Sequence, residues 1–304
     1  MPSSTPRISL GASGLDISRL VYGVWRLAES ADTSVPATLR KIHACLDQGI
    51  TTFDHADIYG NYACEALFGE ALKAEPALAA RLQTVTKCGI MLASSKYPER
   101  KVKHYDTSAA HIRASVDASL QKLGVEVIDL LLLHRPDPFM DPAETGACLD
   151  QLVQSGKVRA VGVSNFQPWD CELLQSAMQT PLASNQIELS LLAQQPFTDG
   201  QLAYLQRKQL PPMAWSPLAG GALFGDGAAA QRVRPVLQAL ASQYGVGLDA
   251  VAVAWLLSHP ARIVPVLGTN DLGRVQALGD AFKVRIDRET WYQLYSLAAG
   301  VEVP

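Results

Sequence analysis

"VIDLLLLH" (residues 127–134) reads as a buried strand that ends in a histidine. Its apolar residues run almost without interruption, whereas a strand with one face in water alternates polar and apolar residues. Such runs are typical of parallel strands covered by helices. Seven further stretches are read as strands, and several share this character: "RLVYGVW" (19–25), "TTFDHA" (51–56), "LQTVTKCG" (82–89), "RAVGVSN" (159–165), "ASNQIEL" (183–189), "PPMAWSPL" (211–218) and "RIVPVLG" (262–268).

Helical patterns lie between these strands, for example at 36–49 and 108–124, where Gly49 and Gly124 are expected to end the helices. Eight strands with helical crossovers predict an α/β fold, a (β/α)8 TIM barrel that spans residues 1–304 as one domain. A doubly wound sheet competes with this interpretation, but the chain has no GxGxxG turn after an early strand.

Three connections stand out from the regular alternation. A short N-terminal β-hairpin is expected to turn at residues 11–14. Residues 90–109 form a long third connection, and the Gly- and Ala-rich residues 219–231 follow the seventh strand. Both long loops fall at the C-terminal face of the predicted barrel, and loops of this length in a compact domain are usually functional.

Composition narrows the class of protein. The chain has 304 residues, 48% of them hydrophobic, and a formal net charge of −3, so neither a nucleic-acid nor a membrane partner is indicated. Its five cysteines are widely spaced and form no CxxC pair, which argues against a disulfide scaffold or a zinc site. Without an apolar signal core, a cytoplasmic protein is expected. The sequence leaves the oligomeric state open.

Titratable side chains end several of the predicted strands. Asp54 and Tyr59 follow the second strand, Lys87 the third and His134 the fourth. In a TIM barrel the active site lies at these strand ends. A nearby ammonium lowers the pKa of a phenol, so Lys87 is expected to make Tyr59 a better acid, with Asp54 holding the ammonium in place. His134 could orient a substrate carbonyl.

A phenol that protonates a carbonyl oxygen needs a hydride at the carbonyl carbon, which indicates a nicotinamide cofactor. The polar ends of the fifth and sixth strands suit its carboxamide, and Trp215 offers a flat face to its ring. The candidate carboxamide-binding residues are Ser164, Asn165 and Gln186.

An ordered set of motifs resembles the aldo-keto reductase family, in the bacterial branch related to potassium-channel β subunits. The matches span nearly the whole chain and comprise "FDHADIYG" (53–60), "VTKCG" (85–89), "LLLHRPD" (131–137), "GVSNF" (162–166), "NQIELS" (185–190), "WSPLAGG" (215–221) and "VPVLGTN" (264–270).

The resemblance implies an NADPH-dependent reductase of aldehydes or ketones that binds NADP(H) without a Rossmann fold, with Tyr59 as general acid. It places Gly23 and Trp25 near the nicotinamide and Asp54 in both the catalytic and the cofactor-binding sets. It assigns a pyrophosphate-binding stretch that comprises Ser216, Pro217, Leu218 and Gly220. It assigns the adenosine 2′-phosphate to Gly268, Thr269, Asn270 and Arg274.

This chain departs from the family pattern beyond Arg274. Ala277 and Leu278 stand where many members have Glu and Asn, which weakens the predicted adenine contacts. Asp271 lies beside the predicted phosphate site, although Arg274 and Thr269 still favour a phosphate over a bare ribose diol.

Other interpretations of the same residues remain open. A cofactor-sensing regulatory subunit with slow turnover would carry the same motifs. Lys87 could form a Schiff base in an aldolase or lyase. A metal hydrolase that uses Asp54, His55, Asp57 and His134 is a weaker alternative, since no HxH occurs and no metal is predicted. Glu65 is expected to be a carboxylate on a helix surface.

Overall fold

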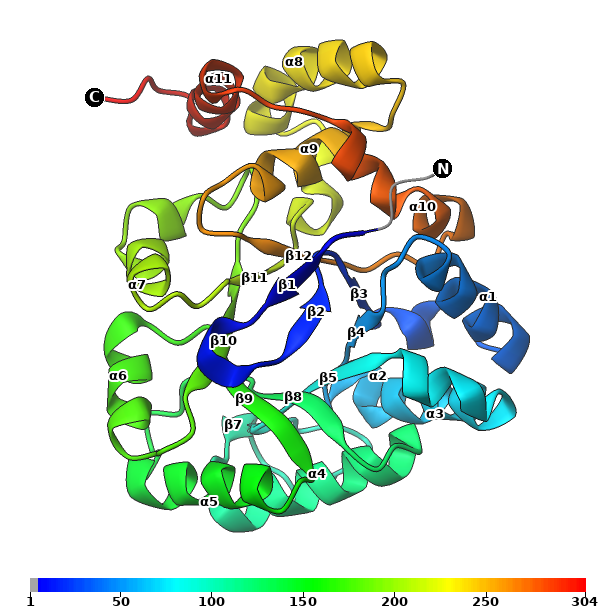
Figure 1. Cartoon of the computed structure of the whole chain (residues 1–304), viewed down its shortest axis with the longest axis vertical. Coiled ribbons are helices and arrows are strands. Elements are labelled where there is room, and N and C mark those ends of the chain that lie inside the picture. The colour runs from blue at the N-terminus through cyan, green and yellow to red at the C-terminus, as the bar shows by residue number, and fades with distance from the viewer. Residues whose placement is uncertain (1–4) are drawn as a thin grey trace.

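The computed structural model describes residues 5–304 and shows a closed barrel of eight parallel strands surrounded by helices (Figure 1). Each predicted strand region overlaps one of them, so the predicted TIM barrel is confirmed. In spatial order around the barrel the strands are β10 (Leu182–Glu188), β11 (Met213–Trp215), β12 (Val264–Leu267), β3 (Val21–Gly23), β4 (Thr52–Asp54), β5 (Gln83–Cys88), β8 (Ile128–Leu133) and β9 (Val158–Ser164).

The continuous apolar runs have a direct structural cause. All six residues of β8 are buried, and its four leucines alternate between two hydrophobic clusters. Leu130 and Leu132 point into the barrel interior, whereas Leu131 and Leu133 pack under the surrounding helices. Because both faces of the strand are covered, the strand is almost entirely apolar, and its one acid, Asp129, accepts from Thr84 N at 2.8 Å and pairs with Arg159 at 3.2 Å.

The outer layer is made of helices that alternate with the strands. The α-helices are α1 (Val35–Leu46), α2 (Tyr59–Tyr62), α3 (Cys64–Ala74), α4 (Ala109–Leu123), α5 (Pro142–Gln154), α6 (Pro168–Ser176), α7 (Gln201–Arg207), α8 (Ala228–Tyr244), α9 (Leu248–Leu257), α10 (Leu272–Gln276) and α11 (Arg288–Ala299). Short 3-10 helices are η1 (Gly11–Ser13), η2 (Leu27–Glu29), η3 (Pro76–Arg81), η4 (Gln195–Phe197), η5 (Ala219–Phe224) and η6 (Leu278–Lys283). Gly124 ends α4 in the left-handed conformation, as predicted.

The predicted N-terminal hairpin forms and crosses the end of the barrel that faces the viewer in Figure 1. It pairs β1 (Arg7–Ser9) with β2 (Asp16–Ser18) in antiparallel register. Ile8 and Ile17 from the hairpin are buried in the same cluster as the residues inside the barrel. The hairpin therefore closes the N-terminal end of the barrel and leaves the C-terminal end for a site.

The two long connections are more regular than the sequence suggested. Within residues 90–109, β6 (Ile90–Met91) pairs with β7 (His104–Tyr105) as a second small hairpin. The connection at 219–231 ends earlier than expected, because α8 already begins at Ala228. Its η5 segment is kinked where Gly220 and Gly221 adopt φ values of 64° and 104°, a conformation that side chains other than glycine rarely adopt.

The C-terminal helix α11 is anchored to the barrel by aromatic stacking and lies beside α8 (Figure 1). The Trp255 and Trp291 rings stack with centroids 4.8 Å apart, and each indole N–H donates to the backbone carbonyl of the other residue. Within residues 5–304, no single helix has the length and apolar character to cross a membrane. Helices α8 and α9 reach that threshold only as a pair with a bend of 97°.

A close approach between α3 and α4 gives a test of the packing. A Cβ added at Gly69 would lie 1.9 Å from the backbone oxygen of Lys122. We expect Gly69→Ala to lower the free energy of unfolding by about 1–3 kcal/mol, although alanine is favoured over glycine inside a helix by about 1 kcal/mol. Urea denaturation followed by circular dichroism measures the change.

Gly227→Ala is the matched control, because a Cβ there meets nothing within 4 Å. Gly227 is the N-cap of α8, where alanine is less favoured than glycine, so we expect a loss of no more than about 1 kcal/mol there. A Gly69→Ala protein as stable as the wild type would show that the two helices can separate without loss.

Candidate active site

Four titratable side chains meet at the C-terminal end of the barrel. Asp54 is the last residue of β4, Lys87 lies near the end of β5, and His134 directly follows β8. Tyr59 begins the short helix that follows the β4 loop. Parallel strands bring these ends together although the residues are far apart in sequence, as the spacing predicted.

Lys87 is the centre of this cluster. Its Nζ donates to both oxygens of Asp54, at 2.8 and 2.7 Å, to the backbone oxygen of His55 at 2.7 Å, and to the Tyr59 hydroxyl at 3.0 Å. The Lys87 side chain is 0% exposed. Three acceptor groups therefore match the three hydrogens of the ammonium, which fixes its orientation.

The hydrogen bond between Lys87 and Tyr59 determines where the phenol proton can go. Because the ammonium donates to the phenol oxygen, the hydroxyl hydrogen of Tyr59 is free to donate to another group. The Tyr59 ring remains partly exposed and meets the His134 ring edge-on, with centroids 5.9 Å apart. A carbonyl oxygen placed at this mouth could accept the hydrogen.

The pKa of Tyr59 shifts in the direction opposite to the expectation. Burial raises the pKa of the phenol more than the Lys87 ammonium lowers it, and the Asp54 carboxylate raises it further. For Lys87, burial lowers the pKa, but Asp54 and Tyr59 together outweigh burial and raise it. At neutral pH the phenol keeps its proton and the lysine stays charged.

His134 is held neutral. Burial lowers its pKa well below the ordinary value, and the positive charges of Lys87 and Arg135 lower it further. A neutral imidazole has one N–H to donate and adds no charge beside the ammonium. The arrangement therefore suits a hydrogen-bond donor better than a cation or a base.

A second ring of polar side chains surrounds the cluster. Gln186 donates from Nε2 to Asp54 Oδ1 at 2.9 Å, which links β10 to β4 across the barrel. Ser164 donates to the backbone oxygen of Gln186 and accepts from Asn165 Nδ2. The indole N–H of Trp215 donates to Asn165 Oδ1 at 2.9 Å, which fixes the plane of the partly exposed ring. The structure thus brings all four predicted nicotinamide-site residues together.

The backbone around these residues is strained. Asn165, Ser216 and Ala219 are not glycines, yet they adopt φ values of 62°, 49° and 52°. Each left-handed residue of this kind carries a cost of about 1–3 kcal/mol and persists only where the surroundings enforce it. Such strain clusters at ligand sites, and here it follows the ends of β9 and β11.

The predicted pyrophosphate stretch follows β11 directly. Ser216 and Leu218 are half-buried, Pro217 is buried, and Gly220 is exposed. Across from this stretch, Arg26 Nη2 approaches the backbone oxygen of Gly220 at 3.5 Å. The neighbouring Trp25, predicted near the nicotinamide, is 52% exposed, so its ring is available to a ligand.

The predicted phosphate-binding residues lie at the end of β12. The Gly23 and Gly268 backbones come so close that a Cβ on Gly268 would lie 3.0 Å from Gly23 O. Tyr22 donates from its hydroxyl to Thr269 O at 2.6 Å. Arg274 is exposed, and within residues 5–304 its side chain forms no ion pair.

The prediction for Glu65 is wrong. Its side chain is 1% exposed, accepts a hydrogen bond from Thr86 at 2.7 Å, and lies 3.5 Å from Lys122 Nζ. Nearby, Asp57 is also buried and accepts from Ser115 at 3.0 Å. The wrong prediction has a physical reason: helical periodicity places Glu65 on α3 but does not reveal that a polar pocket under α4 receives it.

Sequence reasoning also missed the residues that hold the turn after Tyr59. Gly60, Asn61 and Tyr62 adopt φ values of 57°, 52° and 69°, three consecutive left-handed residues. The Tyr62 hydroxyl accepts from Leu92 N at 3.1 Å and from Arg100 Nη1 at 2.8 Å. The 92–100 loop therefore stabilises the strained turn that follows the candidate acid.

The geometry weighs against two of the open alternatives. A Schiff base requires a neutral amine, but Lys87 is charged and bonded on every hydrogen. His55 packs edge-on against Phe68, with centroids 4.6 Å apart, and does not share a ligand position with Asp54. Among residues 5–304, no group of three or more His, Cys, Asp or Glu side chains could hold a metal ion.

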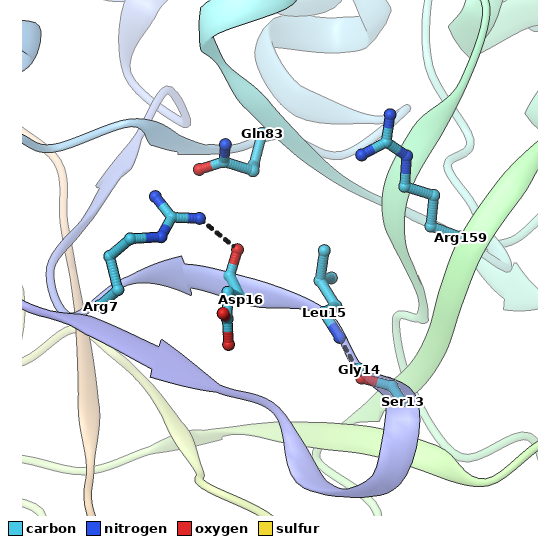
Figure 2. Close-up of a pocket in the computed structure, with 7 residues that line it drawn as sticks. All are labelled: Arg7, Ser13, Gly14, Leu15, Asp16, Gln83 and Arg159. Atoms are coloured by element: carbon cyan, nitrogen blue, oxygen red, sulfur yellow. Dashed lines mark hydrogen bonds between the residues drawn. The ribbon is translucent and has the colours of Figure 1, made fainter.

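A hollow of about 320 Å³ lies at the opposite end of the barrel, beside the N-terminal hairpin (Figure 2). Arg7 donates to the backbone oxygen of Asp16 at 2.6 Å, and Arg159 pairs with Asp129 at 3.2 Å. Both arginines that line the hollow therefore already have partners within the protein. None of the four titratable residues at the strand ends lines this hollow.

The chain is similar to known oxidoreductases over nearly its whole length. The family model described as the Aldo/keto reductase family matches residues 19–299. A 6-dehydroglucose reductase of Agrobacterium fabrum is 56% identical over 297 residues, which cover 98% of this chain and 99% of the relative. The uncharacterized oxidoreductase YcsN of Bacillus subtilis is 44% identical over 300 residues, with 98% and 99% covered.

A solved structure shows the same architecture. The glycerol dehydrogenase of Gluconobacter oxydans superposes with a TM-score of 0.85 at 27% sequence identity. The match covers 99% of this chain and 96% of that one. The likeness therefore extends over the whole barrel.

The buried Asp57 carboxyl predicts a dependence of stability on pH. Burial raises its pKa to about 7 from 3.8, the Ser115 hydrogen bond partly offsets this, Glu65 adds to it and Lys122 opposes it. The stability that this group contributes is complete below about pH 4 and is lost as the pH rises through 7. At about 1.4 kcal/mol per pH unit, the loss is up to about 4 kcal/mol.

We expect Asp57→Asn to lose less stability than the wild type between pH 4 and 8, as measured by urea denaturation at each pH. Asp117→Asn is the control, because Asp117 is more than half exposed. Parallel curves for the wild type and Asp57→Asn would show that this carboxyl does not titrate in that range.

Tyr62→Phe tests the support of the turn after Tyr59. Loss of the Tyr62 hydroxyl leaves the Leu92 N–H and the Arg100 guanidinium without their acceptor, so we expect the free energy of unfolding to fall by about 1–3 kcal/mol. Tyr97→Phe is the control, since it keeps the ring that Arg100 covers at 3.7 Å. Equal denaturation midpoints for the two variants would contradict the support.

Proposed function

The chain belongs to the aldo/keto reductase family, and on that premise we propose that it is an NADPH-dependent reductase that converts a carbonyl to an alcohol. One observation carries the proposal. A fully buried lysine donates to the hydroxyl of Tyr59 at 3.0 Å while Asp54 holds it at 2.7 Å. This contact prepares a phenol to give up its proton at the mouth of the barrel.

The residues present fit a nicotinamide dinucleotide. Trp215 presents a ring whose plane Asn165 fixes, and glycines at 220 and 221 leave the backbone of η5 open to a ligand. Arg274 supplies an exposed cation at the far end. Trp215 would face the nicotinamide ring, Asn165 and Gln186 its carboxamide, and Arg274 the adenosine 2′-phosphate.

The chemistry that the bound cofactor supplies is a hydride for the carbonyl carbon. Tyr59 transfers its hydroxyl proton to the carbonyl oxygen, which becomes the alcohol. The phenolate left behind accepts the hydrogen bond from Lys87, so the ammonium stabilises the charge at the point where it forms. Asp54 keeps the ammonium protonated and oriented, because its carboxylate raises the pKa of Lys87.

His134 orients the carbonyl beside Tyr59. Its imidazole is neutral, so it can donate one hydrogen bond to the carbonyl oxygen without competing with Tyr59 for proton transfer. Its ring lies edge-on to the Tyr59 ring with centroids 5.9 Å apart, so one carbonyl oxygen could lie near both side chains.

We propose a sugar aldehyde as the substrate. The relative at 56% identity is named a 6-dehydroglucose reductase, and the similarity covers 98% of this chain. A glucose oxidised at carbon 6 presents the carbonyl that the mechanism needs.

Tyr59→Phe tests the proposal. Removing the phenol proton should lower kcat by at least about a hundredfold, the typical contribution of a positioned general acid, while the ring still packs and the cofactor still binds. Consumption of NADPH with 6-dehydroglucose, with 4-nitrobenzaldehyde as a second substrate, measures turnover. Quenching of tryptophan fluorescence measures cofactor binding.

Tyr105→Phe is the control, since Tyr105 lies in the β6–β7 hairpin and is not one of the hydrogen-bond partners of Lys87 Nζ. Full activity in Tyr59→Phe would assign the acid elsewhere. Cofactor binding without turnover on any aldehyde would instead favour a cofactor-sensing regulatory protein.

A further inference from the structure

Lys41 is a buried lysine that takes no part in the proposed mechanism. It lies on α1, its residue is 5% exposed, and its Nζ donates to Ser30 Oγ at 3.0 Å and to Asn270 Oδ1 at 3.1 Å. Both acceptors are neutral. A lysine is seldom buried to this degree unless an anion accompanies it.

No carboxylate accompanies this ammonium. Within the part of the chain that the structure describes, no Asp or Glu oxygen lies within 4.0 Å of Lys41 Nζ. Asp32 is the acid that most stabilises its charge, but Asp32 pairs with Arg40 at 3.5 Å. Burial lowers the pKa of Lys41 more than Asp32 raises it, as expected for a cation without a close counter-ion.

The position of Lys41 indicates which anion is missing. Its acceptor Asn270 directly follows Thr269, and α10, which carries Arg274, packs against α1. The Asn270 amide donates to Arg26 O at 2.6 Å, so its oxygen is left to face Lys41. Two cations without carboxylate partners therefore belong to adjoining elements at this end of the barrel.

Asp271 does not neutralise these cations. Its Oδ1 accepts from the backbone N–H of Arg274 at 2.9 Å and caps the first turn of α10. A carboxylate engaged in its own helix is less available to pair with Lys41.

We propose that Lys41 is the second cation of the adenosine 2′-phosphate site and, with Arg274, makes this protein select NADPH over NADH. The inference rests on the proposed function. The ligand class is a phosphate monoester on a ribose, which NADPH and 2′,5′-ADP carry. NADH and 5′-ADP lack this group, so they offer no 2′-phosphate with which Lys41 could form an ion pair.

Lys41→Met and Lys41→Gln test the proposal. Methionine keeps the length of the side chain without the charge, and glutamine also keeps a donor for Ser30 and Asn270. Isothermal titration calorimetry with 2′,5′-ADP and with 5′-ADP measures binding without the nicotinamide. We expect both variants to bind 2′,5′-ADP about tenfold to a hundredfold more weakly, while their 5′-ADP affinity stays within about twofold.

Lys73→Met controls for the loss of one positive charge, because Lys73 is 78% exposed on α3. Unchanged 2′,5′-ADP affinity in both Lys41 variants would overturn the inference and leave the proposed function intact. An equal loss of affinity for both nucleotides would overturn it and show that Lys41 only stabilises the contact between α1 and the segment after β12. A wild-type protein that binds neither NADPH nor NADH by fluorescence would overturn the proposed function and this inference with it.

Discussion

The ion pair between Lys87 and Asp54 is the constraint on which the candidate site depends. Both side chains are almost completely buried, and removing two charges from water costs several kcal/mol per ion, which is offset only where the pair is close and its remaining hydrogen bonds are made. The barrel meets that condition with a carboxylate, a backbone carbonyl and a phenol around one ammonium. Tyr59 is thus part of what makes the buried charge tolerable, which ties the candidate acid to the stability of the core.

The same constraint explains how polar groups are distributed around the mouth. Asp54 needs a further donor once Lys87 has taken its share, and Gln186 supplies one from the opposite wall. Gln186 is held in turn by its place in β10, and its backbone oxygen accepts a hydrogen bond from the Ser164 hydroxyl. Residues from four separate strands are therefore coupled through hydrogen bonds, so the proposed cofactor and catalytic residues form one network.

The fold could be predicted from the sequence because buried strands have a recognisable pattern of apolar residues. Continuous apolar runs such as residues 127–134 predicted strands with two covered faces, and the closed barrel confirms them. The strand ends then predicted that Asp54, Lys87 and His134 would meet. The sequence could not show how the opposing effects on the pKa of Tyr59 balance. The charge of Lys87, which lowers this pKa, was visible, but the burial that raises it further arises from the whole fold. Glu65 and Lys41 were missed because helical spacing does not show which neighbours an inward polar residue will find.

Strand β5 shows why residues outside the site still bear on it. Alternation turns Lys87 inward and its neighbours Thr86 and Cys88 outward, toward α3 and α4. Thr86 donates to Glu65, while the backbone N–H of Asp57 donates to Lys87 O at 3.0 Å. The Glu65 carboxylate therefore holds β5 from the helix side, and the backbone of Asp57 joins the segment before Tyr59 to the same strand. Residues that would touch no substrate are thus bonded directly to the strand and the turn that position Lys87 and Tyr59.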